Sequence, residues 1–480
     1  MLVAATIASL AIVTQDQASL RAAPRESAPV QAVLWQGESL EIRGEDGDYL
    51  QVYDHRRERG GYIRLGQTRV QPVKESDASE LLSITRLLRD MPGSEALGIT
   101  YAATYLSAAP VKAIDGEIFD AIGRMAERLA LRAGAPQQTK RAGETLAAHL
   151  DVVANYGIKM KSFERDGRAQ LCYDGQAHRR VLNLPASNLQ RARAALSLTR
   201  HECVLPDLTP AERFAIDNER AEILDKIETH DLAETVKNRL HMRKAGIWAS
   251  LAYQRVRRTN LGTTAAAEAA ERAIDALAAV NKSELMESDM AAYNDAAIRV
   301  GVSRWAAELT ETATKTVAAK KLSIATTPGQ QPGETCVHLV DAQHDLKNPL
   351  LTRCTYGVVW DTSTSVSRDG TALTLAVQPS DTWREMWLFQ ISKKGWKVDV
   401  VPPSLDAASI GYIEFAGWTP GTKDLLAARE VKDRNHHRTL FEVLRRDTLV
   451  TDKHADKPSS LSPFYRWQDP SWKAKTVSLR

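Results

Sequence analysis

The chain has 480 residues, of which 43% are hydrophobic and 26% charged, and its formal net charge at pH 7 is +3. These are the proportions of an ordinary globular protein with two to four domains. So small a net charge excludes a general attraction to polyanions, and we expect no nucleic-acid partner. The most basic stretch, residues 429–480, holds twelve Lys/Arg and seven Asp/Glu, which favours a solvated face over an anion-binding patch.

Residues 1–20 hold an apolar run, Leu2 to Val13, of about the length of a signal-peptide core. The first basic residue is Arg21, so the charged segment before such a core is poor, and the cleavage signals after Ala18 and Ala22 are weak. A buried N-terminal strand or helix is the alternative. We interpret residues 1–20 as a signal-like segment of an exported, periplasmic protein. The run is too short to span a bilayer comfortably, so we expect no integral membrane span in the mature chain.

Residues 21–32 are rich in Ala, Pro and polar residues, and this composition predicts a linker. Residues 33–75 then alternate apolar and polar side chains with period two, and Gly-rich turn signals divide them. This pattern predicts a β domain of three or four short antiparallel strands. The acidic cluster in this region fits a hairpin tip better than a calcium loop, whose ligand spacing it lacks. Its members are Glu45, Asp46 and Asp48.

The strands of this region follow an order seen in a known family. Gly37 to Ile42, Asp48 to Val52 and Gly61 to Ile63 fill the strand positions of bacterial SH3-like domains, which residues 33–75 resemble. Tyr62 stands where that family usually has Trp, and the family's first strand is missing or degenerate here. The resemblance implies a small β-barrel that binds peptides through an aromatic groove, with half-buried strand aromatics as the alternative. The candidate ligand-binding residues are Tyr49, Tyr53 and Tyr62.

Residues 76–324 change to a helical period, with apolar residues at i, i+3, i+4 and i+7. We predict a central helical domain with a hairpin insertion at about 161–184, where Asp166-Gly167 and Asp174-Gly175 are turn dipeptides. Thr209-Pro210-Ala211-Glu212 combines a cap, a first-turn proline and a capping box, so it predicts a helix start. The domain shows no match to a helical repeat motif.

Residues 325–480 predict a C-terminal β domain that opens with a Pro/Gly linker at 325–334. Trp360 and Trp418 each precede a turn, a strand and an aromatic strand, at a spacing of about 50 residues. These units resemble the blade of Tol-type periplasmic β-propellers, and Trp467 would begin a third, incomplete unit. Because propellers typically need about four to eight blades, a small sheet domain of two stacked meanders is the more cautious interpretation.

The chain has four cysteines, Cys172, Cys203, Cys336 and Cys354. They fall into two local pairs, separated by 31 and 18 positions, and no histidine stands beside them at zinc spacing. An even number of thiols behind an export-like segment favours two disulfides in an oxidising compartment. Four cysteines allow three pairings, and locality favours 172 with 203 and 336 with 354. Because oxidation removes the nucleophile, we expect no catalytic cysteine.

Known catalytic signatures are absent from the sequence. It contains no G-x-S-x-G elbow, no H-E-x-x-H helix, no Walker loop and no G-x-G-x-x-G. His201 lacks the second histidine of a zinc helix, and the adjacent His436 and His437 would face opposite sides of a strand. His230 and His241 fall on separate predicted helices. We therefore expect no catalytic residue, no metal site and no cofactor.

Together these patterns predict a multidomain α+β protein: a small SH3-like β-barrel, a central all-helical domain and a C-terminal antiparallel β domain with blade-like repeats. The function they favour is a non-enzymatic cell-envelope protein that binds or scaffolds a peptide, a protein or a cell-wall component. Two alternatives stay open. One is an envelope hydrolase with its site between the helical and C-terminal β domains. The other is a structural subunit of an envelope assembly.

Overall fold

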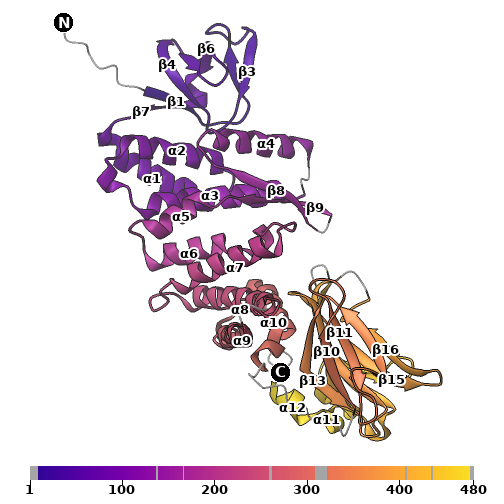
Figure 1. Ribbon diagram of the computed structural model, residues 1–480. Helices are drawn as coiled ribbons and strands as arrows, with labels where there is room; N and C mark the ends of the chain where they lie inside the picture. The colour runs from indigo at the N-terminus through magenta and orange to yellow at the C-terminus, as the bar shows by residue number, and fades with distance from the viewer. Residues whose placement is uncertain are drawn as a thin grey trace. The chain divides into compact units, whose positions relative to one another are not determined.

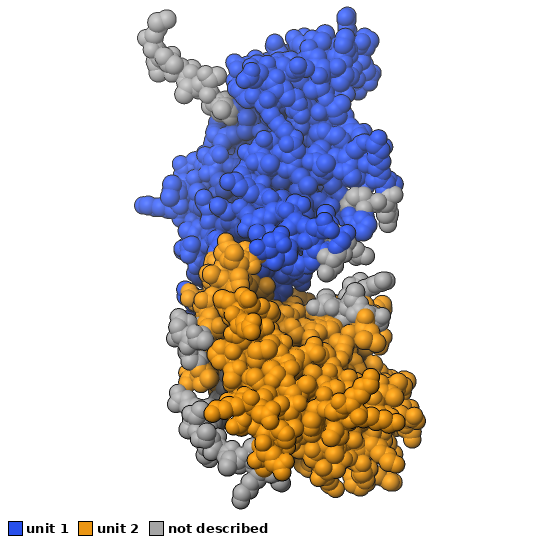
Figure 2. Space-filling view, turned by 45° about the vertical axis from the view of Figure 1, so that its right-hand side comes forward, with its two compact units in different colours: residues 1–207, 226–231 blue, residues 208–225, 232–480 orange. Residues whose placement is uncertain are grey.

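The computed structural model describes residues 9–136, 139–165, 167–258, 262–308, 322–405, 408–433 and 436–475. The protein is a mixed α+β chain with an N-terminal antiparallel sheet, central helices and a C-terminal sheet domain (Figure 1). It folds as two compact units: unit 1 comprises residues 1–207 and 226–231, and unit 2 comprises residues 208–225 and 232–480 (Figure 2). Each unit has apolar cores of its own.

Unit 1 begins with a seven-stranded sheet in the order β3-β2-β6-β5-β4-β1-β7, and each pair of neighbours is antiparallel. Alternate apolar side chains, among them Leu40, Leu50 and Val52, form a core on one face. The strands are β1 (Ser9–Val13), β2 (Ala18–Arg21), β3 (Val30–Leu34), β4 (Ser39–Asp46), β5 (Tyr49–Asp54), β6 (Arg59–Arg64) and β7 (Thr68–Pro72).

Strand β1 corrects the interpretation of residues 1–20 as a signal-like segment, of which residues 1–8 lie outside the described chain. It lies between β4 and β7 and pairs with both. Ala11 and Val13 are buried in the core of the sheet, whereas Ile12 is buried in the core of the helices. A strand that is buried on both faces has a continuous apolar sequence, and a signal-peptide core has one too, so the sequence pattern does not distinguish them.

The β domain therefore begins well before residue 33. Cleavage after Ala18 or Ala22 would detach β1, an internal strand of the sheet. The linker expected at 21–32 connects β2 to β3 and contributes residues to both strands. Its Pro and Ala residues form the loop between two paired strands.

Helices and one hairpin complete the described part of unit 1, and their apolar faces share one core around Leu97, Ile122 and Leu129. The hairpin expected over 161–184 ends at Tyr173, because Gly175, with a φ of +84°, turns the chain directly into a helix. The elements are α1 (Ala78–Arg89), α2 (Glu95–Ala108), α3 (Gly116–Gly134), α4 (Lys140–Ala154), β8 (Met160–Arg165), β9 (Arg168–Tyr173), α5 (Gln176–Asn183) and α6 (Asn188–Leu198).

The N-terminal sheet is fixed to the helices through the turn that follows Trp35, whose ring packs against the helical core. Gly37 has a φ of +92°, and a Cβ at this position would lie 2.8 Å from the backbone of Ala96 on α2. The carbonyl oxygen of Gly37 accepts hydrogen bonds from the Thr100 hydroxyl at 2.6 Å and the Tyr156 hydroxyl at 3.1 Å. This close approach explains why a glycine stands at the turn.

The described residues of unit 2 form four α-helices before its sheets, so the single helical domain expected over 76–324 is divided between the two units. Thr209 and Glu212 form the reciprocal hydrogen bonds of the predicted capping box at the start of the first helix. These helices are α7 (Pro210–Asp225), α8 (Glu234–Val256), α9 (Gly262–Ala278) and α10 (Met290–Ser303), and the 3₁₀-helix η7 (Arg304–Glu308) follows.

The strands described in unit 2 form two sheets. One has the order β10-β11-β12, and the other has the order β13-β14-β15-β17-β18-β19-β20 with β16 paired to β15. The strands are β10 (Ser323–Pro328), β11 (Thr335–Val340), β12 (Leu351–Thr355), β13 (Val358–Val366), β14 (Ala372–Ser380), β15 (Trp383–Ser392), β16 (Gly395–Val401), β17 (Ala408–Trp418), β18 (Asp424–Asp433), β19 (His436–Arg445) and β20 (Thr451–Ala455).

The larger sheet consists of two four-stranded antiparallel meanders, β13 to β16 and β17 to β20. They join where β15 and β17 pair in parallel, with Arg384 opposite Tyr412. In the described residues neither this sheet nor the N-terminal sheet closes on itself.

Two sequence expectations for this region need correction, and a third lies outside it. The linker expected at 325–334 contains most of β10, which pairs with β11. Trp467 ends the short helix α11 (Ser462–Trp467) and begins no third unit, because prolines start α11 and the following α12 (Pro470–Lys475). The sequence also predicts a last strand over residues 475–480, of which 476–480 lie outside the described residues.

Two disulfides tie local segments together. Cys172 of β9 joins Cys203 of the 3₁₀-helix η4 (His201–Cys203), with 5.8 Å between the Cα atoms. Cys336 of β11 joins Cys354, its direct partner on β12, with 3.9 Å between the Cα atoms. Both bridges are compatible with an exported protein. Among the described residues no helix combines the length and apolar character needed to cross a bilayer.

Candidate functional site

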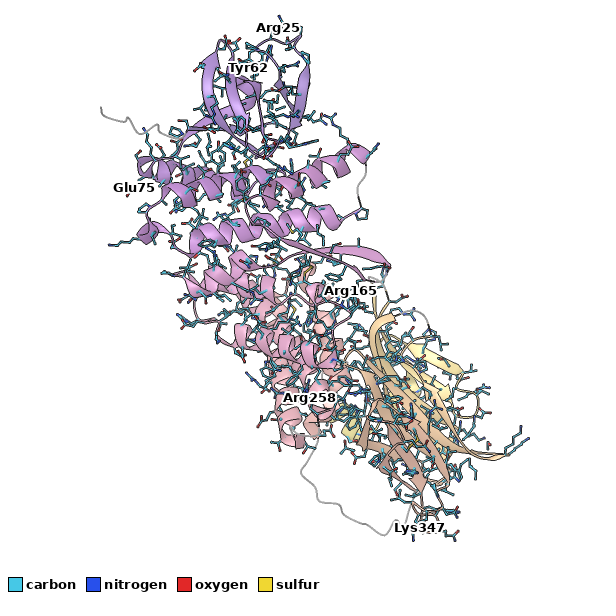
Figure 3. All side chains as sticks on the ribbon, turned by 45° about the horizontal axis from the view of Figure 1, so that its top comes forward. Arg25, Tyr62, Glu75, Arg165, Arg258 and Lys347 are labelled. Atoms are coloured by element: carbon cyan, nitrogen blue, oxygen red, sulfur yellow. A yellow bond between two sulfur atoms is a disulfide. The ribbon has the colours of Figure 1, made fainter. Side chains whose placement is uncertain are left out.

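The three tyrosines singled out from the sequence share one face of the N-terminal sheet. Tyr49 and Tyr53 lie on β5, and Tyr62 of β6 stands opposite Gln51, the alternate residue between them (Figure 3). Because side chains alternate along a strand, all three point away from the core residue Leu50. The sheet therefore places these side chains on one outer surface.

Neighbouring cations cover part of this surface. The guanidinium of Arg64 lies 5.8 Å from the ring centroid of Tyr49 and donates a hydrogen bond to its hydroxyl, and Tyr49 is only 6% exposed. Arg43 lies 5.4 Å from the ring centroid of Tyr53, and Tyr53 and Tyr62 are half-buried. The alternative interpretation, half-buried strand aromatics, thus describes two of the three rings.

A denser polar site lies in unit 2 around Glu414, a buried residue of β17. Its carboxylate accepts hydrogen bonds from Arg304 at 2.5 Å, from Arg384 at 2.6 Å and from the indole of Trp472 at 3.0 Å. Burial alone would raise the pKa of Glu414, but the two guanidinium groups lower it to about 2. Arg384 is fully buried and lies over the ring of Tyr412. The carboxylate is therefore held ionised and in one position.

A pocket of about 130 Å³ lies on this network. Its charged lining residues are Arg304, Glu414 and Asp469, and its aromatic lining residues are Trp305, Phe415 and Trp472. Side chains that carry hydroxyl groups make up much of the rest. They are Thr362, Ser363, Thr364, Ser365, Thr374 and Ser471.

Strand β13 brings four hydroxyl groups to the pocket because it is irregular. Its register with β14 shifts between Trp360, which stands opposite Ala376, and Ser365, which stands opposite Thr374. The hydroxyl of Ser363 spans the irregularity, since it donates to the carbonyl of Trp360 and accepts from the amide of Ala376. Bulges of this kind redirect side chains and are frequent beside functional sites.

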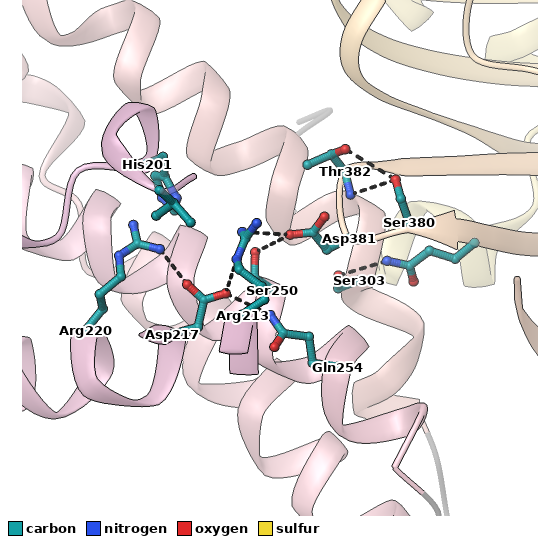
Figure 4. Close-up of polar contacts among 12 residues, drawn as sticks. His201, Arg213, Asp217, Arg220, Ser250, Gln254, Ser303, Ser380, Asp381 and Thr382 are labelled. Atoms are coloured by element: carbon teal, nitrogen blue, oxygen red, sulfur yellow. Dashed lines mark hydrogen bonds and ion pairs between the residues drawn. The ribbon is translucent and has the colours of Figure 1, made fainter. Parts of the chain in front are cut away.

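A second polar network in unit 2 joins α7 and α8 to the turn between β14 and β15 (Figure 4). Asp217 is fully buried and accepts hydrogen bonds from Arg213 and Arg220. Arg213 also donates to Asp381 in the turn, at 3.2 Å, and Ser250 donates to the same carboxylate at 2.9 Å. Arg213 donates to both carboxylates and Ser250 to Asp381, so these two side chains link the helices to the turn, which is the geometry of a structural tie.

Unit 1 holds a buried carboxylate of a different kind. Asp120 on α3 is 1% exposed, and within the described residues neither of its oxygens accepts a hydrogen bond. An ion pair with Arg193 spans 3.9 Å. Burial raises the pKa of Asp120, and the positive charges of Arg124 and Arg193 offset only part of this shift.

His178 on α5 packs against the same face of α3, which carries Asp120, Gly123 and Glu127 at helical spacing. A Cβ at Gly123 would lie 2.4 Å from the imidazole ring. Nε2 of His178 is 3.7 Å from the Glu127 carboxylate, and neither ring nitrogen has a hydrogen-bond partner among the described residues. Burial alone would raise the pKa of Glu127, but His178 and the hydroxyl of Ser197 lower it to about 2.

Two of the other histidines considered from the sequence each pair with a different carboxylate. His437 pairs with Asp295 of α10 at 2.5 Å, while its neighbour His436 is exposed. His230 pairs with the adjacent Asp231 at 2.8 Å. Across the described part of the chain, no three His, Cys, Asp or Glu side chains are placed to hold a metal ion.

Comparison of the chain with known protein families, with characterised proteins and with solved structures finds no match. The unit 2 pocket was not foreseen in the sequence analysis. One signal for it was available: Glu414 interrupts an otherwise apolar strand between Ile413 and Phe415, and a buried charge requires partners. Its partner Arg304 lies 110 positions earlier in the chain, beyond the reach of any local pattern.

Proposed function

We propose that the protein is an exported, non-enzymatic protein that binds or scaffolds a peptide, a protein or a cell-wall component. The observation that carries the proposal is the unit 2 pocket, in which the ionised carboxylate of Glu414 is already paired with two arginines of the protein. A general acid or base exchanges protons most effectively when its pKa lies near the working pH. The pKa of Glu414, about 2, is far below that range, and three donors hold the group. This arrangement favours holding a ligand over converting one.

The proposed export rests on the two disulfides, since such bonds form and persist in oxidising compartments. Because β1 is an internal strand, residues 9–13 must remain in the folded protein. The export proposed here thus requires a mechanism that does not cleave the chain after Ala18 or Ala22.

The resemblances to known modules support a binding role and remain part of the proposal. The sequence of residues 33–75 resembles an SH3-like domain, and one face of the N-terminal sheet presents Tyr53 and Tyr62. The observation in favour of blade-like repeats is that unit 2 contains two four-stranded antiparallel meanders. Modules of both kinds dock ligands on aromatic surfaces or loops.

The hydrolase alternative receives less support. It places a site where helices meet the C-terminal sheets, and in unit 2 this junction holds Asp217 and Asp381. Each carboxylate accepts hydrogen bonds from side chains that link the layers. A carboxylate committed to such ties is poorly placed to activate water or protonate a leaving group.

The test incubates the purified full chain with insoluble cell-wall sacculi and with solubilised envelope proteins. Retained protein and released sugars or free amino groups are measured together. We expect retention without product release. The variants Trp305→Ala in the pocket and Tyr62→Ala on the N-terminal sheet then assign any retention to one surface. Steady product release, or no retention on either material, would refute the proposal.

A further inference from the structure

The pocket of unit 2 combines aromatic faces with hydroxyl groups. Trp305, Phe415 and Trp472 provide the rings, and Thr374, which is fully buried, provides the most enclosed hydroxyl. Aromatic rings present flat apolar surfaces, and hydroxyls both donate and accept hydrogen bonds. A ligand that matches both has an apolar face and a rim of hydroxyl groups.

The volume of the pocket limits the size of the ligand. One buried water needs roughly 10–15 Å³ in the same measure, and an engineered apolar cavity of about 150 Å³ accepts a benzene ring. The pocket, at about 130 Å³, is close to that size, so the part of a ligand that it encloses is limited to about one six-membered ring, with the substituents of the ring at the open side. Sites for larger organic ligands typically measure about 300–1,000 Å³. A peptide segment is therefore too large to be enclosed here.

The charges that line the pocket are already paired. Arg304 donates to Glu414 and to Glu308, and Asp469 accepts hydrogen bonds from the amide and the hydroxyl of Ser471. A charged ligand would have to break one of these contacts and leave a buried charge without a partner, which is strongly unfavourable. A neutral ligand leaves all of them intact.

We propose that the pocket binds one neutral pyranose ring, the unit of a glycan; this inference rests on the binding function proposed above. The apolar C–H face of the ring lies against the aromatic side chains, and its hydroxyls meet those of Thr374 and the irregular strand β13. A free sugar and a sugar unit of the cell wall share this chemistry, so the experiment separates the two sources.

The experiment titrates the full chain with N-acetylglucosamine and follows binding by ligand-observed saturation-transfer NMR. We expect a dissociation constant on the order of 1 mM, because a ligand of this size has few atoms to contribute. Mannitol, which has the hydroxyl groups but no ring, is the matched control ligand and should not bind. In a second measurement, retention of the protein on sacculi tests binding to a sugar that is attached to the cell wall.

Three variants assign the binding. Trp305→Ala should weaken sugar binding at least about tenfold through loss of the ring contact. Thr374→Val, which keeps the volume, tests the buried hydroxyl and should also weaken binding. Trp467→Ala removes a partly exposed indole outside the pocket lining and should leave binding unchanged. Circular dichroism checks that each variant is folded.

Equal binding of mannitol, no saturation below about 50 mM sugar, or unchanged affinity in both pocket variants would overturn the sugar assignment. Retention on sacculi that persists without sugar binding rejects this assignment and leaves the binding function standing. Sugar binding without retention on sacculi supports the pocket assignment, identifies a free sugar as the source and contradicts a wall ligand. Loss of both sugar binding and retention removes both proposals.

Discussion

Asp120 in unit 1 and Glu414 in unit 2 are both buried carboxylates, and their environments differ in one respect. Glu414 accepts hydrogen bonds from two arginines and a tryptophan, whereas neither oxygen of Asp120 has a hydrogen-bond partner among the described residues. Burial pushes both pKa values upward, yet the pKa of Asp120 is raised and that of Glu414 is lowered to about 2. Donors, more than depth, decide whether a buried charge stabilises its unit.

The largest effect is expected from Glu414→Gln. This change leaves the fully buried Arg384 without its counter-ion and leaves Arg304 with Glu308 in place of two carboxylates. Breaking a buried pair in this way typically lowers the free energy of unfolding by about 3–5 kcal/mol. Tryptophan fluorescence during urea unfolding measures it, because nine of the ten tryptophans lie in unit 2 and only Trp35 lies in unit 1.

The control for this variant is Asp452→Asn, which breaks an exposed ion pair with Arg445 in the same unit. Surface pairs of this kind contribute less than about 1 kcal/mol. A loss in Glu414→Gln no greater than in this control would show that the buried network contributes nothing special.

Each unit contains one disulfide, so the stabilisation that a disulfide provides can be compared between the units. The bridge in unit 1 closes a loop of 31 positions and that in unit 2 a loop of 18. From the entropy of the unfolded chain, removing either should cost about 3–4 kcal/mol, slightly more for the longer loop. Paired Cys→Ser variants, measured by hydrogen exchange of each unit, test this. Loss of protection in the unit that keeps its bridge would contradict the assignment.

A smaller contrast is expected within helix α3 of unit 1. Glu127→Gln weakens the charge-assisted hydrogen bonds that Ser197 and Arg200 donate to this side chain. We expect it to lower the free energy of unfolding by about 1.5–3 kcal/mol. Asp120→Asn removes a buried charge that lacks such bonds, so the free energy of unfolding should stay the same or rise at pH 7. Hydrogen exchange of the backbone amides of α3 measures the change in stability in both variants. A clear loss of stability in Asp120→Asn would mean that the carboxylate has a partner in solution.

The smallest effect concerns pH, and its sign differs between the units. Because the pKa of Asp120 is raised in the folded chain, its stabilisation is complete below its ordinary value of 3.8 and is lost as pH rises through the raised value. The advantage of Asp120→Asn over wild type should therefore grow with pH. Glu414 stabilises above its ordinary 4.5 and loses this as pH falls toward 2. Parallel pH profiles of urea midpoints for wild type and both variants check these opposite slopes.

Local patterns in the sequence predicted many of the helices and strands. The hairpin at Gly44 to Asp48, the capping box at Thr209 and Glu212 and most strands of residues 356–445 depend on neighbours a few positions away, and they occur where expected. The signal-like interpretation of residues 1–20 was wrong for Ser9–Val13, because an apolar run has the same composition in a buried strand and in a signal core.

The candidate site was much harder to foresee. Tyr49, Tyr53 and Tyr62 follow from strand alternation, and the structure places them on one face. The pocket instead joins η7, β13, β17 and α12, which lie far apart in sequence. The bulge in β13 and the pairing of Arg304 with Glu414 arise only from tertiary packing.

The position of β1 between β4 and β7 has a consequence for how the chain is made. Its two neighbours end at Asp46 and Pro72, so β1 leaves the ribosome well before the two strands with which it pairs. Until then an apolar segment with two open edges is available to chaperones and to mispairing with another copy.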